Sequence, residues 1–389
     1  MTHRPFRSCV GASLLTLAVL HGCTATQVRY QDVGPGGPEA ATADATLYLV
    51  GDGGEANEHR DAVLRHLAEE IDRLVALEPT RPVVVAFLGD NIYEVGARPS
   101  HEAEDAAHLR AQTEALGHHP HVRGVFVPGN HDWSKGGSDG AGRAAVRVQQ
   151  EWLERLDRAN RIQLLPSDAC PGPSTLDPTP SLHLIFIDTE WLLREPDDGC
   201  GTSDDFYLRL HDDLARHRED RVVLLSHHPM ASGGPHGGNV APLEQGPFVY
   251  YLAVKSGVSI QDIASRRYSE MIRRLEEAIA ASGASPLAHG AGHDHSLQVV
   301  RMEGRGRPRY QLVSGAGSKS NNARRIDGMR YATNGYGYMR LDFHESGADL
   351  VVYAKPRDGG IVRPVFSCSL EEDDGGSGCP EAPLAEDGR

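Results

Sequence analysis

The chain lacks a hydrophobic segment long enough to cross a membrane as a helix. The uncharged run from Val10 to Leu20, which follows Arg4 and Arg7, is shorter than the roughly 20 apolar residues that a transmembrane helix needs. Its length and its basic flank are those of a signal peptide. We therefore expect residues 1–22 to be a signal peptide that directs export, and we expect no transmembrane anchor.

Clustered positive charge is also missing. The chain has 39 Lys and Arg residues against 54 Asp and Glu residues, a net charge of −15, and loss of Arg4 and Arg7 with the signal peptide makes it more negative. A strongly acidic chain binds nucleic acid and anionic membranes poorly. We expect no nucleic-acid partner, and a membrane contact only through a lipid at the N-terminus.

The cysteines do not have the spacing of a zinc site. Cys23 follows Leu20-His21-Gly22, which resembles the lipobox at which bacterial lipoproteins are cleaved and lipidated. We expect Cys23 to carry that lipid, and ordinary cleavage nearby is the alternative. The protein is then a membrane-tethered lipoprotein, or otherwise periplasmic or secreted.

The remaining cysteines indicate an oxidising compartment. After loss of Cys9 with the signal and lipidation of Cys23, an even number is left, namely Cys170, Cys200, Cys368 and Cys379. Pairing within Cys170–Cys200 and within Cys368–Cys379 would close two loops, each with a few kcal/mol of stabilisation. Reduced, unpaired thiols are the alternative.

The chain shows no internal repeat, and its organisation predicts one large domain. Residues 23–44 are rich in Ala, Thr, Gly and Pro without apolar periodicity, which is typical of a flexible tether. We expect the domain to span residues 45–366. The acidic segment 367–389 is expected to be a solvated C-terminal tail.

Apolar runs alternate with amphipathic segments over most of this domain. Buried strands are expected at 45–51, 83–88, 122–127, 183–187 and 222–225, and helices near 57–77, 100–116, 141–158, 204–217 and 261–282. A strand, helix and strand in succession favour parallel pairing. Short runs at 297–302, 309–314, 336–343, 348–354 and 361–366 predict antiparallel strands that complete a second sheet.

Five short polar segments, each expected to follow an apolar run, stand out in this chain. They are Gly51-Asp52-Gly53, Gly89-Asp90-Asn91-Ile92-Tyr93, Gly129-Asn130-His131-Asp132, Ser226-His227-His228-Pro229 and Gly292-His293-Asp294-His295. Strands that end in this way bring Asp, Asn and His side chains to one rim of a sheet, where open α/β folds bind ligands. The segments carry enough oxygen and nitrogen ligands for two adjacent metal ions.

The residue types in these segments suit particular metals. Asp90 can bridge two ions with its two carboxylate oxygens, Asn130 offers an amide oxygen, and the histidines offer imidazole nitrogens. Hard oxygen with borderline nitrogen fits Fe, Zn or Mn. His293 and His295 are two residues apart, so on an extended strand both would point to the same face.

With these motifs the chain resembles the calcineurin-like metallophosphoesterases and, within them, the purple acid phosphatases. GDGG, GDNIY, GNHD, SHHP and GHDH occur in the order of the family over roughly residues 45–355, and Tyr93, three residues after Asp90, is the most discriminating element. The resemblance implies an α/β fold (α+β by some schemes). The fold it implies is a four-layer α/β/β/α sandwich of two mixed sheets, with a dinuclear metal site at the C-terminal rim of the strands.

The resemblance also implies a role for each matching residue. A ferric ion would be held by Asp52, Asp90, Tyr93 and His295, and a divalent ion (Fe²⁺, Zn²⁺ or Mn²⁺) by Asp90, Asn130, His227 and His293. The Tyr93 phenolate would give the charge-transfer colour of the family. His131 would contact the phosphate, and His236, nine residues after His227, would be a second substrate histidine. The resemblance implies no role for His228 or Asp132.

The expected function is that of an exported phosphatase that hydrolyses small phosphate monoesters. A metal-bound hydroxide would attack phosphorus in line, and His131 or His236 would protonate the leaving group. Two alternatives stay open: a metallophosphodiesterase or nucleotide hydrolase of the same superfamily, and a catalytically weak cell-surface binding module. The physiological substrate and the oligomeric state are not encoded in these motifs, although the segment 233–260 is the expected pocket wall.

Overall fold

A computed structural model describes most of the expected domain. The described residues are 30–32, 43–135, 137–157, 161–196, 199–238, 261–357, 359–371 and 378–385. The expected signal peptide, Cys23 and most of the expected pocket wall lie outside these residues. Among the described residues, no helix is both long and apolar enough to cross a membrane.

The first sheet has seven strands in the order β14-β13-β12-β1-β2-β3-β4. Its strands are β1 (Ala45–Val50), β2 (Val83–Phe87), β3 (Val122–Phe126), β4 (Ile162–Leu164), β12 (Tyr336–His344), β13 (Gly347–Lys355) and β14 (Arg363–Ser369). Strands β1 to β4 are parallel, as the alternation of strands and helices predicts. Strands β12 to β14 are antiparallel and extend the sheet beyond β1.

The second sheet also has seven strands, in the order β11-β9-β10-β8-β7-β6-β5. Its strands are β5 (Ser174–Thr179), β6 (Leu182–Phe186), β7 (Arg221–Leu225), β8 (Ala288–Ala291), β9 (Leu297–Arg301), β10 (Tyr310–Ser314) and β11 (Met329–Thr333). Strands β6, β7, β8 and β10 are parallel. Both sheets are therefore mixed, as expected.

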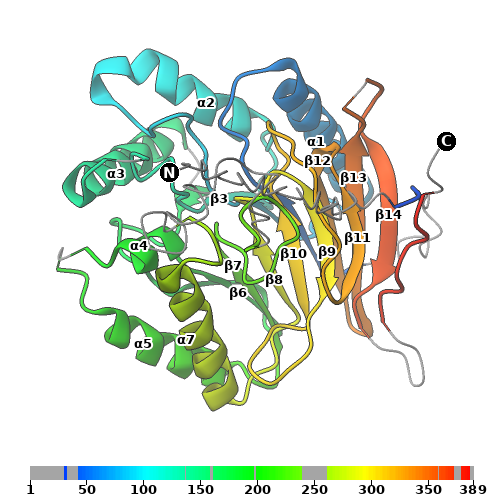
Figure 1. Ribbon diagram of the computed structural model, residues 1–389. Helices are drawn as coiled ribbons and strands as arrows, with labels where there is room; N and C mark the ends of the chain where they lie inside the picture. The colour runs from blue at the N-terminus through cyan, green and yellow to red at the C-terminus, as the bar shows by residue number, and fades with distance from the viewer. Residues whose placement is uncertain are drawn as a thin grey trace, which may run out of the picture.

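Helices cover the outer face of each sheet, and the two sheets pack face to face (Figure 1). The helices are α1 (Glu58–Leu77), α2 (Glu102–Glu114), α3 (Asp139–Leu156), α4 (Thr189–Arg194), α5 (Ser203–Arg216) and α7 (Arg266–Ser282), with a short 3₁₀ turn η1 (Pro99–His101) before α2. Alternate residues of β1 face opposite layers, since Tyr48 and Val50 pack in the cluster under the helices and Leu47 and Leu49 in the cluster between the sheets. The four-layer α/β/β/α sandwich is confirmed.

The strands after residue 297 differ from the expectation in one respect. They do not all complete the second sheet: β9, β10 and β11 do, whereas β12, β13 and β14 join the first. Strand β12 pairs with β1 at the other end of the chain, with Ala45 opposite Phe343. Apolar alternation predicts that a segment is a strand but does not encode its partner, and the short elements β4, β5, β11 and α4 were not expected at all.

The C-terminal segment is not wholly solvated where the structure describes it. Strand β14 crosses the expected domain limit at residue 366, and Cys379 is 0% exposed. Tyr30, in the expected tether, forms a β-bridge with Leu384. The expectation of a solvated tail is therefore wrong for these residues, because a disulfide and apolar contacts hold them against the domain.

Both expected disulfides are present. Cys170 bonds to Cys200 and Cys368 bonds to Cys379, across sequence separations of 30 and 11 residues. The first closes the segment that contains β5, β6 and α4, and the second fixes the C-terminal segment against β14.

We expect the double change Cys170→Ser and Cys200→Ser to lower the free energy of unfolding by about 3–4 kcal/mol, because the unfolded chain regains the entropy of that loop. The matched double change at Cys368 and Cys379 releases a shorter loop and should cost less. Urea unfolding of the purified domain measures both. Equal stability of the first variant and the wild type would contradict the expectation.

Candidate metal centre

The five polar segments follow the carboxyl ends of strands that belong to both sheets. Asp52, Asp90 and Asn130 come after β1, β2 and β3, while His227 and His293 come after β7 and β8. Because these strands are parallel within their sheets and the sheets are packed together, their ends meet at one rim. The sequence pattern therefore places all five segments together, as predicted.

Glycines allow the ligands of neighbouring segments to approach closely. A Cβ on Gly129 would lie 2.3 Å from Oδ1 of Asp90, and a Cβ on Gly292 would lie 2.6 Å from Oδ2 of Asp52. Asp52 and Asp90 themselves have φ angles of 58° and 54°, in the left-handed region. Such a backbone is costly for a residue with a side chain, and it turns the two carboxylates towards each other at the rim.

One group of side chains surrounds the hydroxyl of Tyr93. This hydroxyl lies 3.0 Å from Oδ1 of Asp52, 3.1 Å from Oδ2 of Asp90 and 3.3 Å from Nε2 of His295. Nε2 of His295 is also 3.4 Å from Oδ1 of Asp52. The structure thus brings together the four residues that the resemblance assigns to the ferric ion.

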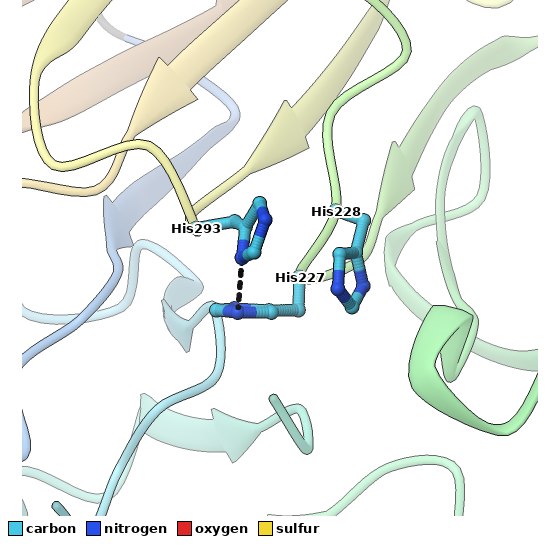
Figure 2. Close-up of side chains that lie close together, drawn as sticks. All are labelled: His227, His228 and His293. Carbon is cyan, nitrogen blue, oxygen red and sulfur yellow. Dashed lines mark hydrogen bonds between the residues drawn. The ribbon is translucent and has the colours of Figure 1, made fainter. Parts of the chain in front are cut away.

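A second group lies on the other side of Asp90. Oδ1 of Asn130 is 3.1 Å from Nε2 of His227 and 3.2 Å from Nδ1 of His293, and those two nitrogens are 3.3 Å apart (Figure 2). Oδ1 of Asp90 lies 3.5 Å from Nε2 of His227. Asp90 therefore contacts both groups, one with each carboxylate oxygen.

The donor atoms of the second group fit a cation. Nδ1 of His227 donates to the carbonyl of Leu88 at 2.8 Å, and Nε2 of His293 donates to the carbonyl of Gln261 at 2.8 Å. In the neutral imidazoles the other nitrogens, which face each other and the amide oxygen of Asn130, then carry lone pairs. Three lone pairs that converge in this way are arranged to bind a metal cation, and the two backbone carbonyls fix the imidazole tautomers that such binding needs.

The charges around Asp90, which contacts both groups, favour its ionised carboxylate form. Burial raises the pKa of Asp90, but the neighbouring His227 and His131 imidazoles and the backbone N–H of His131 lower it more, to about 2. Burial and the carboxylates of Asp52 and Asp90 raise the pKa of Tyr93 well above its ordinary value. The phenol therefore keeps its proton unless a cation offsets the two carboxylates.

The two expected substrate histidines lie beside the centre. Nδ1 of His131 donates to the carbonyl of Glu94 at 2.6 Å, and its Nε2 lies 3.8 Å from Oδ2 of Asp90 and 3.0 Å from Nζ of Lys135. The ring of His236 lies 4.5 Å from that of His293. Both residues therefore lie beside the ligand groups.

The structure gives His228 and Asp132 supporting positions. The ring nitrogens of His228 already have partners, Thr189 Oγ1 at 2.9 Å and Gln261 Oε1 at 2.8 Å. Its ring packs beside those of His227 and His293 (Figure 2). The Asp132 carboxylate accepts the backbone N–H of Asn91 and of Gly129. It thereby ties the second polar segment to the third.

Three further residues at the centre were not expected. Gln261 holds His293 through its carbonyl, Asn321 Nδ2 lies 3.1 Å from Nδ1 of His295, and Nζ of Lys319 lies 3.6 Å from the centre of the Tyr93 ring. Lys319 and Asn321 could have been found, because the segment after β10 is another glycine-rich polar segment at the end of an apolar run. A contact through a main-chain carbonyl, as at Gln261, has no sequence signature.

Comparison with known proteins agrees with this geometry. A family model described as calcineurin-like phosphoesterase matches residues 45–259. No curated protein is similar enough in sequence to match the chain. The match to the family model covers more than half of the chain.

Two solved structures have a similar fold. One is GAP50, described as the anchor in the inner membrane complex of Plasmodium, with 15% identity and a TM-score of 0.55 over 85% of this chain and 90% of that one. The other is PhoD, with 14% identity and a TM-score of 0.55 over 87% of this chain and 72% of that one. Together with the cluster of Asp52, Asp90 and His227 and the neighbouring His293, the family supports a dinuclear site for divalent metal ions. The chain belongs to the calcineurin-like phosphoesterase family.

Proposed function

We propose that the protein is an exported phosphatase that hydrolyses phosphate monoesters, similar to the purple acid phosphatases. The observation that carries this proposal is the position of the Tyr93 hydroxyl, within 3.3 Å of Asp52, Asp90 and His295. A tyrosine among metal ligands favours iron in the trivalent state. The two disulfides support an oxidising compartment, and a lipid on Cys23 would keep the protein at a membrane.

The ligand residues would form two metal sites that share Asp90. Asp52, Asp90, Tyr93 and His295 would hold Fe³⁺, and Asp90, Asn130, His227 and His293 would hold Fe²⁺, Zn²⁺ or Mn²⁺. When bound, such a pair supplies Lewis acidity at the phosphoryl oxygens and lowers the pKa of water. The carbonyls of Leu88 and Gln261 orient His227 and His293 for this purpose.

Proton transfer falls to the histidines beside the ligands. Nδ1 of His131 is fixed by the carbonyl of Glu94, so its Nε2 is the atom that faces Asp90 and the substrate. In the neutral ring the proton is on Nδ1, and Nε2 accepts from the Lys135 ammonium at 3.0 Å. Nε2 would therefore protonate the departing alkoxide from the imidazolium form, which carries a second proton on Nε2. His236 lies over His293 and would contact the phosphate from the other side.

Hydrolysis of para-nitrophenyl phosphate and of its bis-ester, from acid to neutral pH, tests the proposal. We expect the purified mature domain to prefer the monoester in acid. Preference for the diester would overturn the monoesterase and favour a phosphodiesterase or nucleotide hydrolase. No turnover of either ester with metals bound would favour a binding module. Asp90→Asn serves as the blank.

We expect Tyr93→Phe to remove any purple colour of the purified protein, because the charge-transfer band needs the phenolate oxygen. The measurement is the visible absorption spectrum at matched iron content. Tyr268→Phe is a matched control, since Tyr268 is buried near His293 but donates its hydroxyl to the carbonyl of Pro229. Colour that persists unchanged in Tyr93→Phe would refute a Tyr93–iron bond.

A further inference from the structure

A second group of metal-binding side chains lies at the opposite end of the second sheet. We call it the basal cluster, and it consists of His183, His217 and Asp220, with Asp177 behind them. His183 is the second residue of β6, and Asp220 directly precedes β7. The cluster thus lies where β6 and β7 begin, whereas the metal centre lies where β7 ends.

His183 is held between two carboxylates. Its Nδ1 lies 2.7 Å from Oδ1 of Asp177, and its Nε2 lies 3.2 Å from Oδ2 of Asp220. The side chain of His183 is 6% exposed, whereas those of Asp177 and Asp220 are 54% and 38% exposed, so a buried imidazole meets two carboxylates at the surface. The ring of His217 lies against it, with ring centres 3.7 Å apart.

When the His183 imidazole is neutral, one of its two contacts with a carboxylate joins two hydrogen-bond acceptors. If Nδ1 of His183 donates to Asp177, then Nε2 carries a lone pair and faces the Asp220 carboxylate, which can only accept. A metal ion uses all three donors, because His183, His217 and Asp220 each offer a ligand atom and these atoms lie within 4.8 Å of one another.

We propose that the basal cluster binds a divalent transition metal ion of the zinc class. His183 Nε2, His217 and Asp220 are its ligands, and two imidazoles with one carboxylate suit Zn²⁺. Asp177 holds the Nδ1–H of His183. A carboxylate in that position is the usual partner of a metal-bound histidine, since it fixes the tautomer and the orientation of the ring.

The fold brings these ligands together before any ion binds. The backbone N–H of Asp220 donates to the carbonyl of His217 at 3.1 Å, which closes the turn that carries both ligands. The third ligand, His183, is positioned by the pairing of β6 with β7, in which Leu182 lies opposite Arg221 and His183 lies opposite Val222. A bound ion would join the end of α5, the start of β7 and, through Asp177, the edge strand β5.

The role of this ion is structural. The basal cluster lies at the strand ends opposite the metal centre, and the ion would stabilise the native state in proportion to its concentration relative to its dissociation constant. This inference does not depend on the proposed phosphatase activity. Its test therefore needs no turnover.

The experiment is a Zn²⁺ titration of the purified mature protein, with bound metal counted by elemental analysis and the Tm recorded at each concentration. We expect His217→Gln to bind one ion fewer than the wild type and to lose the part of the Tm increase that this ion produces. His217 is partly exposed at the end of α5, so the variant should fold. His211→Gln is the matched control, because His211 lies on the same helix and pairs with Asp212.

A second variant separates metal binding from simple packing. We expect Asp177→Asn to keep the site but to weaken Zn²⁺ binding about 10–100-fold, the usual effect of losing a carboxylate behind a histidine ligand. Identical metal counts and Tm increases for wild type, His217→Gln and His211→Gln would overturn the proposal.

Discussion

We expect Asp90→Asn to abolish hydrolysis, lowering kcat/KM by at least about 10³-fold, the scale of losing a preorganised electrostatic group. Asp90 contacts both ligand groups, with Oδ2 3.1 Å from the Tyr93 hydroxyl and Oδ1 3.5 Å from Nε2 of His227. Asparagine has the same shape, but its side chain is neutral and has an NH2 group in place of one carboxylate oxygen. It cannot bridge two cations.

Activity and metal content of Asp90→Asn should fall together. Assays with a chromogenic phosphate ester and elemental analysis measure the two effects on the same sample. Asp72→Asn is a suitable control, because Asp72 is exposed and pairs with His119 on the surface. Full turnover by Asp90→Asn with the fold intact would refute the bridging role.

The second large effect concerns stability. We expect Asp132→Ala to lower the free energy of unfolding by about 4–5 kcal/mol, at the upper end for single substitutions. Asp132 is 0% exposed and accepts the backbone N–H groups of Asn91, Ile92 and Gly129 and the side-chain amide of Asn91. Alanine leaves these buried donors without an acceptor, and each costs about 1–3 kcal/mol.

Urea unfolding measures this loss. Asp139→Ala is the control, since Asp139 is an exposed aspartate at the start of α3 and its ion pair with Arg194 is 3.6 Å long. A loss below about 1 kcal/mol for Asp132→Ala would mean that water replaces the carboxylate, and that the second and third polar segments are held by other contacts.

The parts of the site that follow strand ends could be predicted from the sequence. Asp52, Asp90 and Asn130 each follow a glycine at the end of a buried strand, and parallel strands bring such positions to one rim. The glycines themselves are explained by distance, since a Cβ on Gly129 would collide with Asp90. Local pattern and tertiary requirement agree at these positions.

Other features depend on contacts that local pattern does not encode. The pairing of β12 with β1 joins the two ends of the domain, and the sequence of neither strand predicts which strand it pairs with. Gln261 contacts His293 through its backbone carbonyl and His228 through its side chain, a role open to any residue with a similar side chain at that point. Burial of Cys379 likewise depends on the disulfide to Cys368 and on the surrounding packing.

Anomalous diffraction from crystals of the metal-loaded protein tests the central claim most directly. We predict two peaks about 3.5–4 Å apart, one on each side of Asp90, the first beside Tyr93 and His295 and the second beside Asn130 and His227. A single peak, or two peaks that Asp90 does not bridge, would contradict the dinuclear centre.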